Sequence, residues 1–174
     1  MNKKYLLALI MVIIVAVGIF VFTSPPFGHL PLAGEDSRTN ESLPLSASLR
    51  LENGQEIKLR VADEPKERAL GLSYFKSLSQ DQGMLFLFDK PGVYPFWMKD
   101  MNFPLDIIWL KRGQDGGYRV VYVAHNVLPS SYPNSINPKM DADAVLEINP
   151  PAGGDSATVY NLSPEKNLWI TFKK

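Results

Sequence analysis

From residue 45 onward the chain consists of short apolar runs that stop at glycine, proline or asparagine, and this feature limits the fold more than any other. Residues 47–51 and 56–61 alternate apolar with polar side chains on either side of Asn53-Gly54, which is the strongest short-range signal of a β-hairpin. Such alternation turns one face of each strand inward and the other toward water. The pattern therefore predicts short strands rather than long helices.

The later runs extend this pattern to the end of the sequence. Residues 84–88 are apolar at every position, which is typical of a strand covered on both faces, so we expect it at the centre of the sheet. Residues 105–111 and 118–124 flank the turn at Gly116-Gly117 and predict a second hairpin. Eight or nine short strands indicate a mostly β domain, a single compact β-sandwich or flattened barrel. The other expected strands are residues 96–99, 144–148, 157–161 and 168–172.

One short helix is expected between the first hairpin and the central strand. Asp63 or Glu64 can cap its N-terminus, Pro65 fits its first turn, and Gly71 can close it. Arg68 lies within this helix.

The N-terminus predicts a membrane attachment. Residues 6–22 carry no charge, follow Lys3 and Lys4, and number 17, near the minimum that spans about 30 Å of hydrocarbon. We expect residues 1–4 in the cytoplasm, a transmembrane signal anchor at residues 5–22, a flexible tether at 23–44 and an extracytoplasmic β-domain at 45–174. A cleaved signal peptide is the alternative and would leave the domain periplasmic or secreted, but residues 23–26 lack a clear cleavage site.

Composition narrows the classes of function. Of 18 Lys and Arg residues two precede the anchor, which leaves 16 against 18 Asp and Glu residues, a net charge of −2 for the exported part. We therefore expect no nucleic-acid partner, because no basic footprint is present. The chain has no cysteine and only two isolated histidines, His29 and His125, so we expect no metal site and no cofactor. His125 is expected at the surface.

The clearest functional signal is one lysine and one aspartate among large hydrophobic residues at 83–110. An unpaired buried charge costs several kcal/mol, so Lys99 and Asp106 should be paired, exposed or placed at a site. Residues two apart in a strand share a face, which puts Trp97 beside Lys99 and Asp106 beside Ile108. We predict that Arg68, Trp97, Lys99 and Asp106 converge near one opening of the fold and bind a small polar ligand, a carboxylate or a sugar.

A structural ion pair is the competing interpretation of the same residues, and it is the more common one. Met84, Phe86, Phe88, Phe96 and Met98 are expected in the core. The proline-rich segment 128–143 is either a lid or binding edge, or a packed connector.

Five motifs follow one another in order along the chain: Arg68-Ala69-Leu70-Gly71-Leu72, Gly83-Met84-Leu85-Phe86, Phe96-Trp97-Met98-Lys99, Pro104-Leu105-Asp106 and Val145-Leu146-Glu147. They resemble those of domain-of-unknown-function family 192, whose members are small prokaryotic domains, many of them exported. The resemblance implies a compact mostly β sandwich or barrel and no established activity. Members often have Asn-Thr where Asp100-Met101 stands and an Arg where Phe75 lies, and Asn149-Pro150-Pro151 replaces a glycine-bearing stretch.

The leading hypothesis is a membrane-anchored extracytoplasmic domain that binds a small polar ligand or an envelope protein without catalysis. A second is an enzyme in which Asp106 or Glu147 acts as general base and Lys99 stabilises charge. A third is a structural module that docks on a neighbouring membrane protein, which a large exposed apolar patch would favour.

Overall fold

The structure is a computed structural model that describes residues 43–174 except Tyr74, Gly153 and Lys174. The predictions for residues 1–42, including the signal anchor at 5–22 and most of the tether, lie outside the described residues. Within the described range, no helix combines the length and the apolar character needed to cross a membrane.

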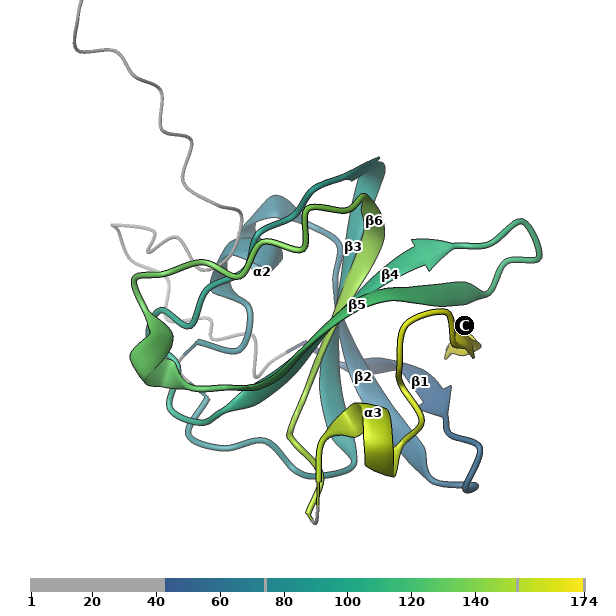
Figure 1. The fold of residues 1–174 in the computed structure, drawn as a ribbon, viewed down its shortest axis with the longest axis horizontal. Helices are drawn as coiled ribbons and strands as arrows, with labels where there is room; N and C mark the ends of the chain where they lie inside the picture. Colours follow the sequence, from purple (N-terminus) through teal and green to yellow (C-terminus); the bar gives the residue numbers. More distant parts are fainter. Residues whose placement is uncertain (1–42, 74, 153, 174) are drawn as a thin grey trace, which may run out of the picture.

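Eight strands form one continuous sheet in the order β7-β5-β4-β6-β3-β2-β1-β8 (Figure 1). Neighbours pair antiparallel except β2 and β3, which are parallel. The mostly β prediction is confirmed, and the sheet is a nearly closed barrel rather than two facing sheets. The strands are β1 (Leu45–Arg50), β2 (Glu56–Ala62), β3 (Gln82–Gly92), β4 (Leu105–Arg112), β5 (Tyr118–Val127), β6 (Ala142–Ile148), β7 (Asn167–Leu168) and β8 (Ile170–Phe172).

The two outermost strands of this sheet follow each other directly in the sequence. β7 pairs with β5 at one edge, β8 pairs with β1 at the other, and Trp169 alone separates them. In Figure 1 the C-terminal segment lies between the β4–β5 hairpin and β1. The predicted strand at 168–172 is therefore two short strands, which together bring the edges of the sheet close to each other.

Both predicted hairpins and the central strand are confirmed. β1 pairs with β2 across Gly54, whose φ of 86° lies in the left-handed region that favours glycine. β4 pairs with β5 through the turn that contains Gly116, at φ 85°. β3 lies between β2 and β6, inside the sheet.

The helix predicted before Gly71 is α2 (Pro65–Leu70). Its N-cap is Glu64, and Glu67 Oε2 accepts hydrogen bonds of 3.1 Å from the backbone N–H groups of Asp63 and Glu64. Gly71 ends the helix at φ 51°. The described chain also contains a 3-10 turn, η2 (Pro129–Ser131).

Two of the expected strands are wrong. Residues 157–161 fall in and after a short helix, α3 (Ser156–Val159), because the Asp155 carboxylate caps the Thr158 N–H at 2.8 Å. Residues 96–99 form no strand, and Phe96 makes only an isolated bridge with Ile136. Phe96 and Met98 are nevertheless buried while Trp97 and Lys99 are half-buried, so the expected alternation of faces holds.

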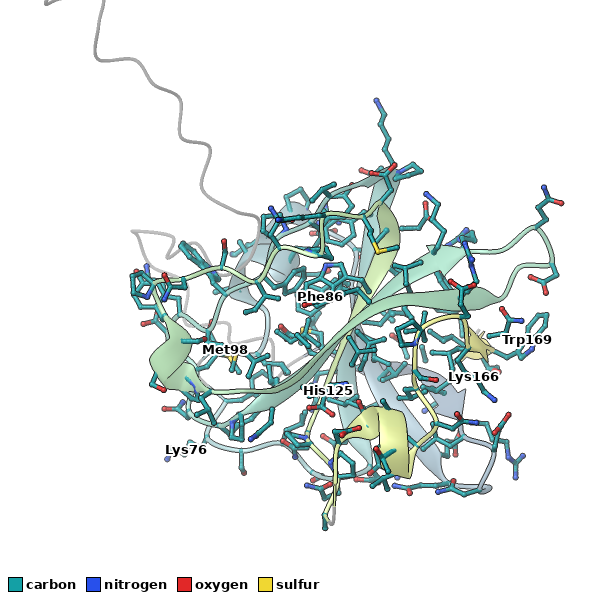
Figure 2. The ribbon with its side chains drawn as sticks, in the orientation of Figure 1. Lys76, Phe86, Met98, His125, Lys166 and Trp169 are labelled. Atoms are coloured by element: carbon teal, nitrogen blue, oxygen red, sulfur yellow. The ribbon has the colours of Figure 1, made fainter. Side chains whose placement is uncertain are left out.

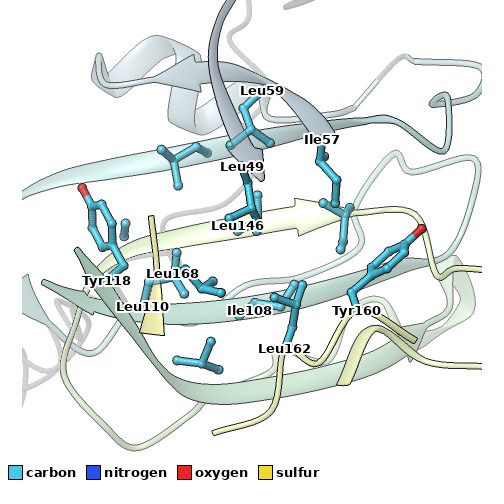
Figure 3. Close-up of a cluster of buried hydrophobic side chains, with 14 of the residues drawn as sticks. Leu49, Ile57, Leu59, Ile108, Leu110, Tyr118, Leu146, Tyr160, Leu162 and Leu168 are labelled. Atoms are coloured by element: carbon cyan, nitrogen blue, oxygen red, sulfur yellow. The ribbon is translucent and has the colours of Figure 1, made fainter. Parts of the chain in front are cut away.

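The sheet separates two hydrophobic clusters. The inner cluster draws on every strand except β8, whose Ile170 packs against it, and fills the nearly closed sheet (Figure 3). The outer cluster covers the other face of β2 to β6 and is completed by the segments around residues 72–78 and 96–103. Met84, Phe86, Phe96 and Met98 belong to the outer cluster and Phe88 packs against it, as expected of core residues.

Candidate functional site

The segment that carries Trp97 and Lys99 lies over the outer cluster. Phe96 and Met98 point into that cluster, and Ser73 Oγ donates to the Lys99 carbonyl at 3.3 Å. The turn that follows needs a residue that tolerates the left-handed region, and Asp100 occupies it at φ 57°. Asn and Asp adopt this conformation more readily than other non-glycine residues. Asp100 therefore meets the same backbone requirement as the Asn often found there in the resembling family.

The Lys99 side chain returns toward the ring two residues earlier in the sequence. Its Nζ lies 6.0 Å from the centre of the Trp97 ring, within the range of a cation–π contact. In the described part of the chain, Lys99 has no carboxylate partner. Its ammonium is therefore held beside an aromatic face without a neutralising charge.

The proline-rich segment 128–143 packs against the segment that carries Trp97 and Lys99. Phe96 and Ile136 exchange backbone hydrogen bonds of 3.0 and 2.7 Å, which hold the two segments together. The Tyr132 ring meets the Trp97 ring edge to face, with 5.6 Å between their centres. The segment 128–143 therefore packs on the Trp97 segment, as its interpretation as a packed connector expects, and its interpretation as a lid or binding edge stays a prediction.

Two polar atoms here are buried without a partner among the described residues. They are Trp97 Nε1 and Ser131 Oγ. Buried polar groups nearly always find a hydrogen bond, so an unpartnered buried donor marks a place where a polar group of a ligand could bind. We call Trp97, Lys99, Ser131 and Tyr132 the Trp97 patch.

Asp106 lies elsewhere, at one end of the barrel interior. It follows the first residue of β4, shares its face with Ile108, and is fully buried, as expected from the alternation. Its two carboxylate oxygens accept hydrogen bonds from the backbone N–H groups of Asn126 at 2.7 Å and Ser156 at 2.8 Å. Asp106 thus ties the start of β4 to the end of β5 and to α3.

His125 lies above this carboxylate at the surface. Its Nδ1 is 3.8 Å from Asp106 Oδ2 and 3.8 Å from Asp155 Oδ1, which is too long for hydrogen bonds. The expected surface position is confirmed, since 37% of the side chain is exposed. The backbone N–H of Thr158 lowers the pKa of the Asp155 carboxyl, which keeps this helix cap ionised.

Arg68 lies in a third place. Its guanidinium donates to the carbonyl oxygens of Asp63 and Leu87, the latter at 3.0 Å, and stacks 5.5 Å from the centre of the Phe88 ring. With Phe88 and Tyr94 it lines a cleft of about 270 Å³, and the two rings stack with their centres 3.5 Å apart. Burial raises the pKa of the Tyr94 phenol.

The structure brings together Trp97 and Lys99 but not all four predicted residues. Asp106 is on the inner face of the sheet, whereas the Trp97 segment packs on the outer cluster. Lys99 and Asp106 form no ion pair, and backbone N–H groups occupy the carboxylate instead. The expected convergence of these two charges is therefore wrong, because a strand's alternation does not say on which side of the sheet the preceding segment packs.

The most unusual polar residue is Glu147, which the sequence suggested only as an alternative general base. It is fully buried in β6 between Met84 of β3 and Ile107 of β4, and neither carboxylate oxygen has a hydrogen-bond partner in the described chain. Burial raises its pKa from 4.5 to about 8, so the carboxyl is protonated at neutral pH. The available signal was Glu147 itself, the one acidic residue in the apolar run at residues 144–148 of β6.

Comparisons with known proteins find one matching family and two similar solved structures. The model of family DUF192, described as an uncharacterised ACR, matches residues 48–158. A proposed transcription regulator from Sinorhizobium meliloti 1021 is 25% identical with a TM-score of 0.59, and the match covers 71% of this chain and 91% of that one. A protein of unknown function from Novosphingobium aromaticivorans DSM 12444 is 24% identical with a TM-score of 0.59, over 80% of this chain and 100% of that one. No curated protein matches the chain.

Proposed function

The chain belongs to the DUF192 family, which is uncharacterised, and on this premise we propose that its β-domain binds a small carboxylate-bearing ligand at the Trp97 patch without catalysis. The domain is held outside the cytoplasm by the apolar segment at residues 5–22. The observation that carries the proposal is the buried, unpartnered Trp97 Nε1 beside an ammonium group that no carboxylate neutralises.

The groups of the Trp97 patch point to an anionic acceptor. The indole N–H and the Lys99 ammonium can only donate hydrogen bonds, and the Ser131 hydroxyl can donate one. A carboxylate offers two acceptor oxygens and a compensating charge, and such charge-assisted bonds are the strong ones. Tyr132, 42% exposed, gives the ligand an aromatic wall. A ligand with a carboxylate therefore fits better than a neutral sugar.

The geometry gives less support to the enzyme hypothesis. Backbone N–H groups already donate to both oxygens of the buried Asp106 carboxylate, so this group is engaged in holding the fold together. Glu147 is enclosed among apolar side chains of the outer cluster, where a substrate does not reach it. The charge balance also gives no support to DNA binding, the role suggested by the name of the similar Sinorhizobium protein. The part after the anchor has 16 basic against 18 acidic residues and no basic footprint for DNA.

A binding partner in the envelope is a second candidate. Leu128, Tyr132 and Met140 are 49%, 42% and 45% exposed along the loop that borders the Trp97 patch. Apolar side chains gathered on one loop are a common feature of protein contact surfaces. Such a partner would cover Leu128 and Met140 beside the patch and would also contact Tyr132, which belongs to it.

Thermal stability in the presence of small carboxylates tests the ligand proposal. The full chain in a mild detergent is titrated with acetate, succinate and citrate, and a ligand that binds only the folded state raises the melting temperature. Lys99→Met should abolish the rise, because the neutralising charge is lost. Lys76→Met, which removes an exposed lysine, is the matched control and should keep it. An equal rise in the Lys99→Met variant would show that the patch is not the site.

The membrane attachment is tested separately. The full chain should remain with the membrane fraction after carbonate extraction, and a variant lacking residues 5–22 should not. A full-length chain that carbonate releases would contradict the anchor, although ligand binding could still hold.

A further inference from the structure

A second cleft opens at the mouth of the barrel. Its volume is about 640 Å³, within the range of small-molecule sites. Figure 2 places Lys166 and Trp169 of this cleft at the opposite end of the molecule from Met98, which lies in the segment of the Trp97 patch. Its floor is the end of the inner cluster, formed by Leu51, Tyr160, Leu162 and Leu168. We call it the barrel-mouth cleft.

The rim of the cleft carries an exposed aromatic ring. Trp169 is 59% exposed, although the strands on either side of it are paired at opposite edges of the sheet. A Cβ at Gly117 would lie 3.5 Å from Trp169 Cε3, so the indole rests on the backbone of the β4–β5 turn. The ring is therefore supported from one side while a large apolar surface remains open to water. Exposed tryptophans of this kind mark binding surfaces more often than bare surface.

The charged groups of the rim compensate one another. Glu52 accepts hydrogen bonds from Lys166 Nζ and from Asn161 Nδ2, the latter at 2.8 Å. Lys166 lowers the pKa of the Glu52 carboxyl, which therefore stays an ionised acceptor. With Arg50 and Glu165 the lining has two cations and two carboxylates, so its formal charge is zero, and Glu165 is also paired with Arg119 outside the lining at 2.7 Å. A charged ligand gains no net attraction from such a rim.

Hydroxyl groups suit this environment, because each can donate to a carboxylate and accept from an ammonium or guanidinium. The remaining requirement is a flat apolar surface that can lie against the indole. Sugar rings have both properties, with hydroxyls at the edge and C–H groups on the faces. We propose that the barrel-mouth cleft binds a neutral saccharide, whose ring stacks on Trp169 and whose hydroxyls contact Glu52 and Lys166. This site shares no residue with the Trp97 patch, so either proposal can fail without the other.

The test measures oligosaccharide binding to the full chain in lauryldimethylamine oxide, a detergent without a sugar head group. Maltotetraose, cellotetraose and chitotetraose are titrated by calorimetry, and the tryptophan indole N–H resonances are followed by NMR. At least one of the three should bind saturably and shift the Trp169 indole resonance. Trp169→Ala should weaken binding by about tenfold or more, which corresponds to about 1.4 kcal/mol. Trp169→Phe keeps an aromatic face and should retain most of the affinity, and Lys76→Met, at an exposed position far from the cleft, should retain all of it.

Several outcomes would overturn the proposal. One is the absence of saturable binding for all three oligosaccharides at concentrations of about 10 mM, where even weak sites of Kd about 1 mM would be filled. Another is unchanged affinity in Trp169→Ala. If that variant does not fold, Glu52→Gln takes its place and should also weaken binding. Tighter binding of tetragalacturonate than of the neutral probes would contradict the assignment to neutral sugars.

Discussion

Replacement of Glu147 by glutamine should make the stability of the protein less dependent on pH. The carboxyl has no partner in the described chain and its pKa is raised from 4.5 to about 8 by burial. Between these two values the unfolded chain releases the proton and the folded protein keeps it. The folded state therefore binds more protons, and the free energy of unfolding falls as the pH rises. Below pH 4.5 the Glu147 carboxyl causes no loss of unfolding free energy, and above about pH 8 this loss has reached its full and constant size.

The size of the effect follows from the shift. Each pKa unit corresponds to about 1.36 kcal/mol, so a shift from 4.5 to about 8 costs on the order of 4 to 5 kcal/mol at alkaline pH. That is a large part of the roughly 5–15 kcal/mol that stabilises an ordinary domain. Glutamine keeps the shape of the side chain and cannot ionise, so Glu147→Gln should not show this loss.

The measurement is urea unfolding of the full chain and the variant at several pH values between about pH 5 and pH 8. Only the difference between the two free energies is used, because other titrating groups contribute equally to both. Near pH 5 the two should differ by about 1 kcal/mol or less, and the variant should gain by about 1.4 kcal/mol for each further pH unit. Val145→Ala, which shortens a buried side chain of β6 that cannot ionise, is the control and should give a difference that does not change with pH.

A constant difference between wild type and Glu147→Gln over this pH range would refute the reasoning. It would mean that the folded carboxyl ionises as it does in the unfolded chain. The Glu147 carboxyl would then contact water or an opposite charge, and it would not be kept protonated by burial.

Three further changes test the fold. Gly83→Ala should cost about 2–3 kcal/mol in urea unfolding, because a Cβ would lie 2.7 Å from the backbone oxygen of Glu147. Asp106→Ala should cost about 3 kcal/mol or more by calorimetry, since two backbone N–H groups lose their charged acceptor, and an effect below about 1 kcal/mol would contradict that role. At Asp100, with φ 57°, replacement by Val should lower thermal stability by about 1–3 kcal/mol and replacement by Asn should be neutral; equal effects would argue against backbone strain as the cause.

The sheet was predictable where the signal was local. The Asn53-Gly54 turn, the Gly116-Gly117 turn between β4 and β5, and the apolar β3 each depend on residues close in sequence. The closure of the sheet was not predictable, because β7 and β8 have two and three residues and their pairing partners are far away in the chain. The strand expected at 157–161 is absent for a different reason, since the Asp155 carboxylate caps a short helix there and this local hydrogen bond outweighs the apolar pattern.

The candidate site shows the same division. That Trp97 and Lys99 lie on one side followed from their spacing, and the contact between them is present. That Asp106 faces the other cluster could not be read from spacing, because it depends on how the segment at 96–103 folds back over the sheet. The partners of Asp106 are backbone groups, which carry no sequence signature.

The arrangement of β7 and β8 has a consequence for proteolysis and aggregation. A single short segment covers the outer strand at each margin of the sheet, with β5 on one side and β1 on the other. A cut between Lys166 and Asn167 would remove both covers at once and leave two rows of free backbone donors and acceptors, which are templates for pairing with other chains. Nicked molecules should therefore self-associate through both margins and grow into chains of subunits, instead of stopping at dimers.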